Sequence, residues 1–145
     1  MPKTATAWPE KGSMLVLGES SLFGNVIHAY SRAQAIEDGF MVDLSQSSAA
    51  KECGFTFPIA MTRAVWDKYV EVPPKVKGQD VNGRLWDIVY MLHYAIKKTG
   101  ATELVNFVVY VRNDNSRAKA VRLKAICGPG DDASPVITIM LPGES

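Results

Sequence analysis

The chain has 145 residues, of which 47% are hydrophobic and 21% charged, and its formal net charge is +1 at pH 7. This composition is typical of a folded domain and excludes a disordered tail, a collagen-like chain and a coiled coil. The length suits one domain with its own core. No apolar run approaches the roughly 20 residues that cross a bilayer, so we expect no membrane segment.

The net charge conceals an asymmetry between the two halves of the chain. Residues 1–72 hold six Lys and Arg against eight Asp and Glu, whereas residues 73–145 hold ten against seven. Most of the excess is a basic cluster that only Asp114 opposes: Arg112, Arg117, Lys119, Arg122 and Lys124. Such a cluster is a candidate contact for an acidic partner.

The start of the chain lacks the apolar core of a signal peptide, so we expect a cytoplasmic protein. Residues 1–23 are expected to form a loosely ordered segment, and residues 24–145 a single domain. In the cytoplasm two distant cysteines, at positions 53 and 127, are expected to remain thiols. Residues 14–17 read as a brief strand, and residues 26–30 as a strand or an irregular entry to the domain.

Ser31 and Gln34 have the spacing of a helix capping box, and Gly39 suits the left-handed residue that follows a helix. They predict a short helix over about residues 32–38. A short strand over residues 40–44 is expected to follow it.

Ser45 is a plausible cap for a second short helix that ends at Gly54. Residues 54–58 alternate aromatic and polar side chains before a proline, so we expect an extended connection. A third helix is predicted to begin at Thr62 and to stop before Pro73.

The strongest helical pattern in the chain predicts a long helix over about residues 82–99, with Asp80 or Asn82 as its cap and Gly100 after it. Its apolar residues recur at helical spacing: Val81, Leu85, Ile88, Leu92, Ala95 and Ile96. The polar connection before it, residues 75–79, is predicted to be the most flexible internal segment.

The last third of the chain changes to a period of two residues. Three strands over residues 104–112, 119–127 and 136–141 are predicted, separated by turn clusters and joined as an antiparallel meander. In the middle strand Arg122 and Lys124 share the face opposite its apolar residues. We therefore predict an α+β domain of short N-terminal strands and helices, in which the long helix packs on the apolar side of a C-terminal three-stranded meander.

Catalytic motifs are lacking: there is no nucleophile elbow, Walker loop or dinucleotide fingerprint. Three polar residues, His28, Tyr30 and Arg32, gather where the predicted strand meets the first helix and form a candidate pocket. Asp131 and Asp132 supply too few oxygens for a calcium site and are expected in a solvated turn. We expect no metal and no cofactor, and the sequence leans away from an enzyme.

The basic cluster is open to two interpretations. If its cations converge on one hairpin, they form a binding face for an acidic protein surface or for nucleic-acid phosphates. A solvated strand face that discourages edge pairing explains the same residues. Because the sequence offers no platform of several exposed aromatic side chains, direct nucleic-acid binding is the less expected of the two contacts.

Several strings resemble, in the same order, a domain family of unknown function: Tyr30–Gly39, Thr62–Trp66, Gly83–Asp87 and Val136–Glu144 (YSRAQAIEDG, TRAVW, GRLWD and VITIMLPGE). The resemblance covers about residues 24–144. It implies a small soluble protein encoded by a bacterium, plasmid or phage, and it supplies no catalytic residues.

Together these features favour a non-enzymatic accessory protein of a mobile element that binds a host protein or nucleoprotein complex, with inhibition of a host defence system as one use of that binding. The alternative is a nucleotide-binding enzyme, because the segment from His28 to Arg32 faintly resembles the opening of ADP-ribosyltransferase-like folds. Against it, Glu103 and Glu144 lie at predicted strand ends, where neither supplies the interior glutamate of such a site. The terminal residues 142–144 have no evident structural role in the sequence.

Overall fold

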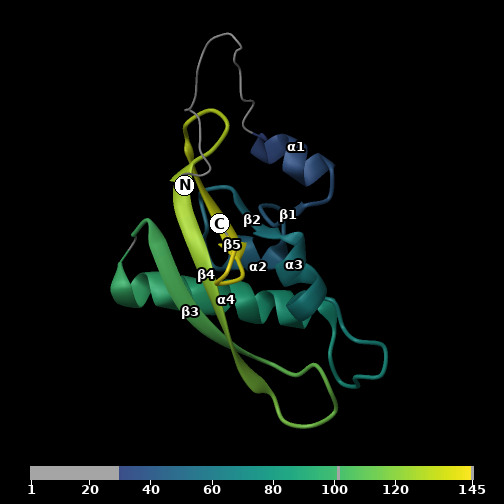
Figure 1. The fold of residues 1–145 in the computed structure, drawn as a ribbon. Coiled ribbons are helices and arrows are strands. Elements are labelled where there is room, and N and C mark those ends of the chain that lie inside the picture. The colour runs from purple at the N-terminus through teal and green to yellow at the C-terminus, as the bar shows by residue number, and fades with distance from the viewer. Residues whose placement is uncertain (1–29, 101, 145) are drawn as a thin grey trace.

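The computed structural model describes residues 30–100 and 102–144 (Figure 1). Its centre is a five-stranded mixed sheet in the order β1-β2-β5-β4-β3. The long helix α4 (Val81–Thr99) lies against one face of this sheet. The α+β class is therefore confirmed, although the sheet has two strands more than the predicted meander. The strand predicted over residues 14–17 lies outside the described residues.

The C-terminal meander is confirmed. It consists of β3 (Leu104–Val111), β4 (Lys119–Pro129) and β5 (Pro135–Met140), with β4 antiparallel to both neighbours. Along β3 every second residue is buried and the others are exposed. This alternation is the pattern from which the strand was predicted, since one face of the strand meets the core and the other meets solvent.

Two strands complete the sheet: β1 (Met41–Asp43) and β2 (Ile59–Thr62). The first was predicted, whereas the second falls where the sequence indicated only a connection. β2 lies inside the sheet, antiparallel to β1 and parallel to β5. Ile59, Ala60 and Met61 are all fully buried. A strand covered on both faces shows no alternation, which is why the periodicity missed it.

The second helix, α2 (Ser48–Glu52), begins two residues later than predicted. Its cap is Ser47, whose hydroxyl accepts a hydrogen bond from the backbone N–H of Ala50 at 3.2 Å. Ser45 instead accepts the N–H of Ile59 at 3.1 Å and so joins the start of this segment to β2.

The other helix starts match their predicted caps. Thr62 caps α3 (Arg63–Val65), which continues as the π-helical turn η1 (Trp66–Val70). The helical segment ends before Pro73, as predicted. Asp80 caps α4, and its carboxylate accepts the N–H of Gly83 at 2.5 Å.

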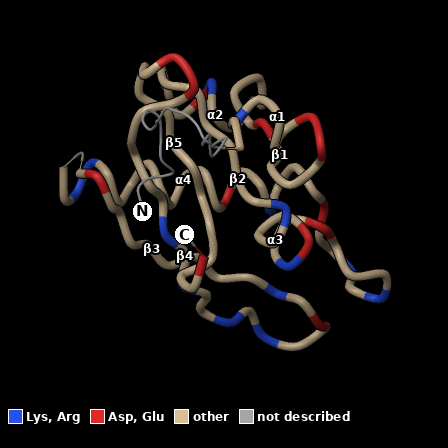
Figure 2. The backbone as a smooth tube through the Cα atoms, turned by 45° about the horizontal axis from the view of Figure 1, so that its top comes forward, with Lys and Arg blue, Asp and Glu red and all other residues tan. Residues whose placement is uncertain are grey.

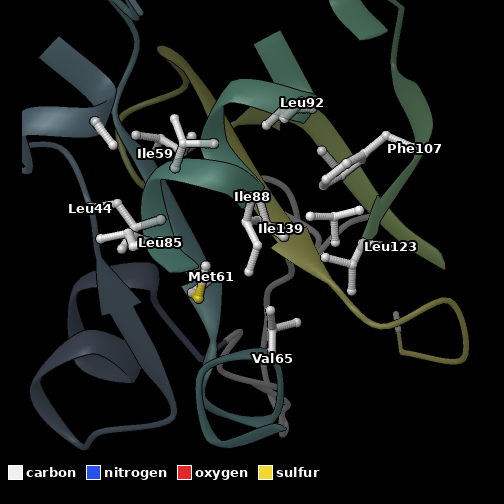
Figure 3. Close-up of a cluster of buried hydrophobic side chains, with 14 of the residues drawn as sticks. Leu44, Ile59, Met61, Val65, Leu85, Ile88, Leu92, Phe107, Leu123 and Ile139 are labelled. Carbon is white, nitrogen blue, oxygen red and sulfur yellow. The ribbon is translucent and has the colours of Figure 1, made fainter. Parts of the chain in front are cut away.

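The main core lies between α4 and the sheet (Figure 3). Leu85, Ile88 and Leu92 project from α4 toward residues of four strands and of the segments beside them. Their partners include Leu44, Ile59, Met61, Val65, Phe107, Leu123 and Ile139. This buried layer fixes α4 beneath the meander, as the sequence predicted.

A smaller core lies on the opposite face of the sheet. The first helix, α1 (Arg32–Glu37), contributes Ala35 and Ile36, which pack against Met41 of β1 and Ala60 of β2. Met41 and Ala60 alternate with residues of the main core, so they face away from α4. The two helices therefore cover opposite faces. None of the described helices is long and apolar enough to cross a membrane.

Candidate binding face

Of the three residues of the predicted pocket, the structure describes Tyr30 and Arg32, and their side chains bond to different partners. His28 lies outside the described residues. The guanidinium of Arg32 turns toward the sheet, where Nη1 donates to Thr138 Oγ1 at 2.6 Å and Nη2 donates to the carbonyl oxygen of Ile137 at 2.7 Å. Burial lowers the pKa of Arg32 to about 10, although nearby carboxylates favour its charged form. Arg32 thus fastens α1 to β5, whereas the Tyr30 hydroxyl bonds to Asp38.

Asp131 also holds α1 in place from the turn between β4 and β5. Its carboxylate accepts the backbone N–H of Arg32 at 2.8 Å and that of Ala33 at 3.0 Å. Ser31 caps the first turn of α1 by accepting the N–H of Gln34 at 3.0 Å. These bonds satisfy N–H groups that a helix start leaves unpaired. A residue expected in a solvated turn therefore positions the first helix.

Tyr30 lies at the rim of a shallow depression. Its hydroxyl donates to the Asp38 carboxylate, and this hydrogen bond is the main cause that raises the pKa of Tyr30 to about 12. Its ring meets that of Phe40 edge-on, with 6.0 Å between the ring centroids. The depression has a volume of about 490 Å³ and is lined by Tyr30, Ala35, Phe40, Met41, Thr62, Arg63, Ala64 and Glu144.

The polar side chains that line this depression are engaged in hydrogen bonds within the chain. Arg63 Nε donates to the carbonyl oxygen of Gly39 at 2.9 Å, and the Thr62 hydroxyl donates to Glu144 Oε1 at 2.8 Å. The same oxygen of Glu144 accepts the N–H of Leu141 at 2.8 Å. Glu144 thus ties the C-terminal segment to β2, a role the sequence did not reveal. Among residues 30–100 and 102–144, the titratable side chains that line the depression are Tyr30, Arg63 and Glu144, and each has a hydrogen bond within the chain.

Arg112, the first residue of the predicted basic cluster, is used structurally. Its guanidinium donates to the carbonyl oxygen of Lys77. Beside it, Asn115 accepts the N–H of Lys77 at 3.0 Å and donates to the carbonyl oxygen of Lys75 at 2.8 Å. The β3–β4 turn therefore holds the connection that was predicted to be the most flexible internal segment.

Arg84 is a buried cation that the sequence analysis did not identify. It is only 5% exposed, and desolvation lowers its pKa. Its guanidinium donates to the carbonyl oxygens of Tyr69 at 2.8 Å and of Arg112 at 3.3 Å, and to the side chain of Asn113. Tyr69 belongs to η1, and the other two partners lie at the start of the β3–β4 turn. Arg84 therefore joins α4 to both segments and is not free to bind a ligand.

The remaining cations of the cluster follow the hairpin (Figure 2). Arg117 and Lys119 are exposed near its turn, where the Lys119 ammonium lies 4.0 Å from the Asp114 carboxylate. Arg122 and Lys124 lie further along β4, on the face away from α4. The structure thus places four of the five predicted cations on β4 and its turn. Arg112 lies at the same turn, where its Nη1 donates to the carbonyl oxygen of Asp114 at 3.3 Å, but its guanidinium is engaged by the backbone of the connection before α4.

Apolar side chains share this face with the cations. Leu104, Val108 and Tyr110 of β3 are exposed by 50%, 41% and 68%. The strand register places Val108 opposite Arg122, and Asn106 opposite Lys124. We call this surface the outer face and define it as Leu104, Asn106, Val108 and Tyr110 of β3 with Arg122 and Lys124 of β4.

The position of the helices explains why the outer face is exposed. α4 occupies the other side of the sheet, and α1 covers the outer side only over β1, β2 and part of β5. Within residues 30–100 and 102–144, no helix lies over β3 and β4 on this side. The alternation along β3 already divides its residues into two sets in the sequence, but the predicted binding face contained only cations and none of the apolar residues of β3.

Comparison with known proteins gives one result. A family model described as "Family of unknown function (DUF6573)" matches residues 21–145. The match begins three residues before the resemblance found in the sequence and reaches the end of the chain. Searches of the curated proteins and of the solved structures find no match to this chain.

Proposed function

This chain belongs to the DUF6573 family of unknown function, and we propose that it is a non-enzymatic binding protein that contacts its partner through the outer face. The observation that carries the proposal is the combination on one open face of exposed apolar side chains and two cations. Apolar side chains grouped on an exposed surface and bordered by polar groups are typical of interaction sites.

The charge of the outer face indicates the class of partner. Arg122 and Lys124 stand beside the apolar row of β3, so a complementary surface has acidic groups next to an apolar patch. Tyr110 is the one aromatic side chain of this face. Single strands of nucleic acid are usually held by several stacked aromatic side chains. The face therefore suits an acidic protein surface, alone or within a nucleoprotein complex, better than bare nucleic acid.

A capture experiment with matched variants tests this proposal. The full chain is immobilised and exposed to lysate of a bacterial host, and retained proteins are quantified by mass spectrometry. The Arg122→Glu/Lys124→Glu variant is expected to lose a specific partner. The control, Lys51→Glu/Lys68→Glu, makes the same change of charge at exposed residues of α2 and η1. Equal retention by both variants would contradict the proposal.

The role in a mobile element is a further part of the proposal. What supports it is the resemblance of the four strings to a family of unknown function, which implies a small protein encoded by a bacterium, plasmid or phage and so suggests a partner in the host. Inhibition of a host defence system is one effect that such binding would have. Expression in a host that carries a defence system is expected to restore phage plating, and the Arg122→Glu/Lys124→Glu variant is expected to lose that effect.

The nucleotide-binding alternative gains no support from the geometry of the described residues. Arg32 is bonded to the sheet and does not line the depression beside Tyr30. Titration of the full chain with NAD in a calorimeter is therefore expected to release no heat of binding. A saturable heat that disappears in the Tyr30→Phe variant would favour the alternative over the binding protein proposed above.

A further inference from the structure

The two edges of the sheet differ in a way that bears on assembly. One edge is β1, which has three residues and includes Asp43. The other is β3, whose eight residues (LVNFVVYV) include no charge and no proline. Short strands, charges and prolines are the usual means of preventing an edge from pairing with another strand. β3 has none of them, and no described segment pairs with its outer edge.

The hydrogen-bond pattern identifies the main-chain groups at this edge. The N–H of Cys127 donates to the carbonyl oxygen of Glu103 at 2.9 Å, so the odd-numbered residues that follow in β3 bond to β4. In an antiparallel ladder the alternate residues point their N–H and C=O groups to the opposite side. The groups at the free edge therefore belong to Leu104, Asn106, Val108 and Tyr110.

α4 lies directly beneath this edge and runs antiparallel to β3. It packs mainly against β3 among the strands. Near its first turn Arg84 reaches the carbonyl oxygen of Arg112 just beyond the end of β3, and its last residue, Thr99, is close in sequence to Leu104. The middle of the helix, between Met91 and Tyr94, thus lies under the middle of β3.

One flank of α4 faces away from α2, toward the solvent beyond the free edge of β3. On the other flank, Trp86 donates to Glu52, the last residue of α2, and His93 packs edge-on against Phe55 in the segment that follows α2. The flank of Arg84 continues at helical spacing with a stripe of Asp87, Met91, Tyr94 and Lys98. Met91 is half-buried and the other three side chains of the stripe are exposed. Its two ends carry opposite charges.

From these placements we infer that β3 pairs with β3 of a second copy of this chain, antiparallel about a two-fold axis, to form a homodimer with one continuous sheet. The register that uses all four free-edge residues sets Leu104 opposite the partner's Tyr110 and Asn106 opposite the partner's Val108. The axis then passes beside Phe107, above the middle of α4.

The same axis makes the stripe on α4 self-complementary. A two-fold rotation sets Met91 opposite the partner's Tyr94 and Asp87 opposite the partner's Lys98. The uncharged edge and the complementary ends of the stripe thus both fit a second copy, whereas an acidic or basic segment would match only one end of the stripe. The inference is independent of the proposed function, because the outer face stays exposed in a dimer joined at its edge.

Sedimentation equilibrium of the full chain tests the inference. The unaltered protein is expected to form dimers, and the exposed-site variants Asp87→Lys and Lys98→Asp are each expected to weaken the dimer about tenfold, since each sets like charges opposite one another twice. The double variant Asp87→Lys/Lys98→Asp is expected to restore it. A monomer at every concentration, or no recovery in the double variant, would overturn the inference.

Hydrogen exchange distinguishes a second copy from other occupants of the edge. In a dimer the amides of Asn106, Val108 and Tyr110 are protected, and dilution removes the protection. Protection that is independent of concentration would mean that another part of the same chain covers the edge, which overturns the inference. Asn106→Pro, which removes a free-edge N–H, is expected to abolish the dimer while Asn106→Ala keeps it. Because these readouts concern self-association alone, they can fail without affecting the proposed function.

Discussion

Hydrogen bonds from a few polar side chains join segments of this molecule that lie far apart in the chain. Arg32 and Asp131 hold α1 on the sheet, and Arg112 holds the connection before α4. No local pattern in the sequence assigns these roles, because the partners that these residues join are between 35 and 106 residues away. Arg122 and Lys124 differ, since strand alternation was enough to place them on the solvent side.

Removing the Arg32 guanidinium is expected to destabilise the protein. Arg32→Met leaves Thr138 Oγ1 and the carbonyl oxygen of Ile137 without their donor, at a cost of about 2 kcal/mol in the free energy of unfolding. Arg122→Met, on the outer face, is the control and is expected to change stability by less than about 0.5 kcal/mol. Urea unfolding measures both. Equal effects would contradict the structural role of Arg32.

The thiol of Cys127 is expected to react slowly in the folded protein. Desolvation raises its pKa, so at pH 8 a smaller fraction is thiolate than in the unfolded chain. The pH profile of its alkylation by iodoacetamide, followed by mass spectrometry, should therefore rise at higher pH in the folded protein than in urea. Coincident profiles would show that the thiol is not desolvated.

At the scale of elements, the parts with strong periodicity were predicted well. The long helix and the three strands of the meander lie within two residues of their predicted bounds. β2 was missed because both of its faces are buried, and its parallel pairing with β5 joins segments far apart in the chain. Such pairing depends on tertiary packing, which leaves no local pattern in the sequence.

The helix α1 is expected to depend on Asp131. A six-residue helix is not stable alone, and Asp131→Ala removes the acceptor of two of its N–H groups, at a cost of about 1 kcal/mol. Hydrogen exchange at Arg32 and Ala33 should accelerate, whereas amides of α4 should not change. Asp132→Ala is the control, because Asp132 accepts only the N–H of Ser134 within its own turn. Equal acceleration in both variants would contradict this account.

The connection of residues 75–79 is expected to resist proteolysis as long as Asn115 holds it. Asn115→Ala removes the hydrogen bonds to Lys75 and Lys77 and should increase tryptic cleavage after these lysines several-fold. Ser116→Ala, which affects bonds only within the β3–β4 turn, should leave cleavage unchanged. If the unaltered protein were cleaved after these lysines as rapidly as the Asn115→Ala variant, Asn115 would not hold the connection, and the prediction of a flexible segment would stand.

At the scale of the whole molecule, one sheet separates two different environments. The side of α4 holds the main core, whereas on the opposite side the described helices cover only the part near β1 and leave β3 and β4 exposed. The excess positive charge of the second half of the chain lies largely on this open part and its turn. Composition revealed the asymmetry, but only the order of the strands shows that cations and exposed apolar residues share a face.

Photo-crosslinking from single positions tests the central claim, that the outer face binds the partner. In one variant a benzophenone side chain replaces Tyr110 on the outer face. In the matched control it replaces Phe57, which is also an exposed aromatic residue but lies outside the outer face. After irradiation in host lysate, the protein labelled at position 110 is expected to give a discrete adduct with a second protein species, and the protein labelled at position 57 is not. The same adduct from position 57, with none from position 110, would contradict the claim.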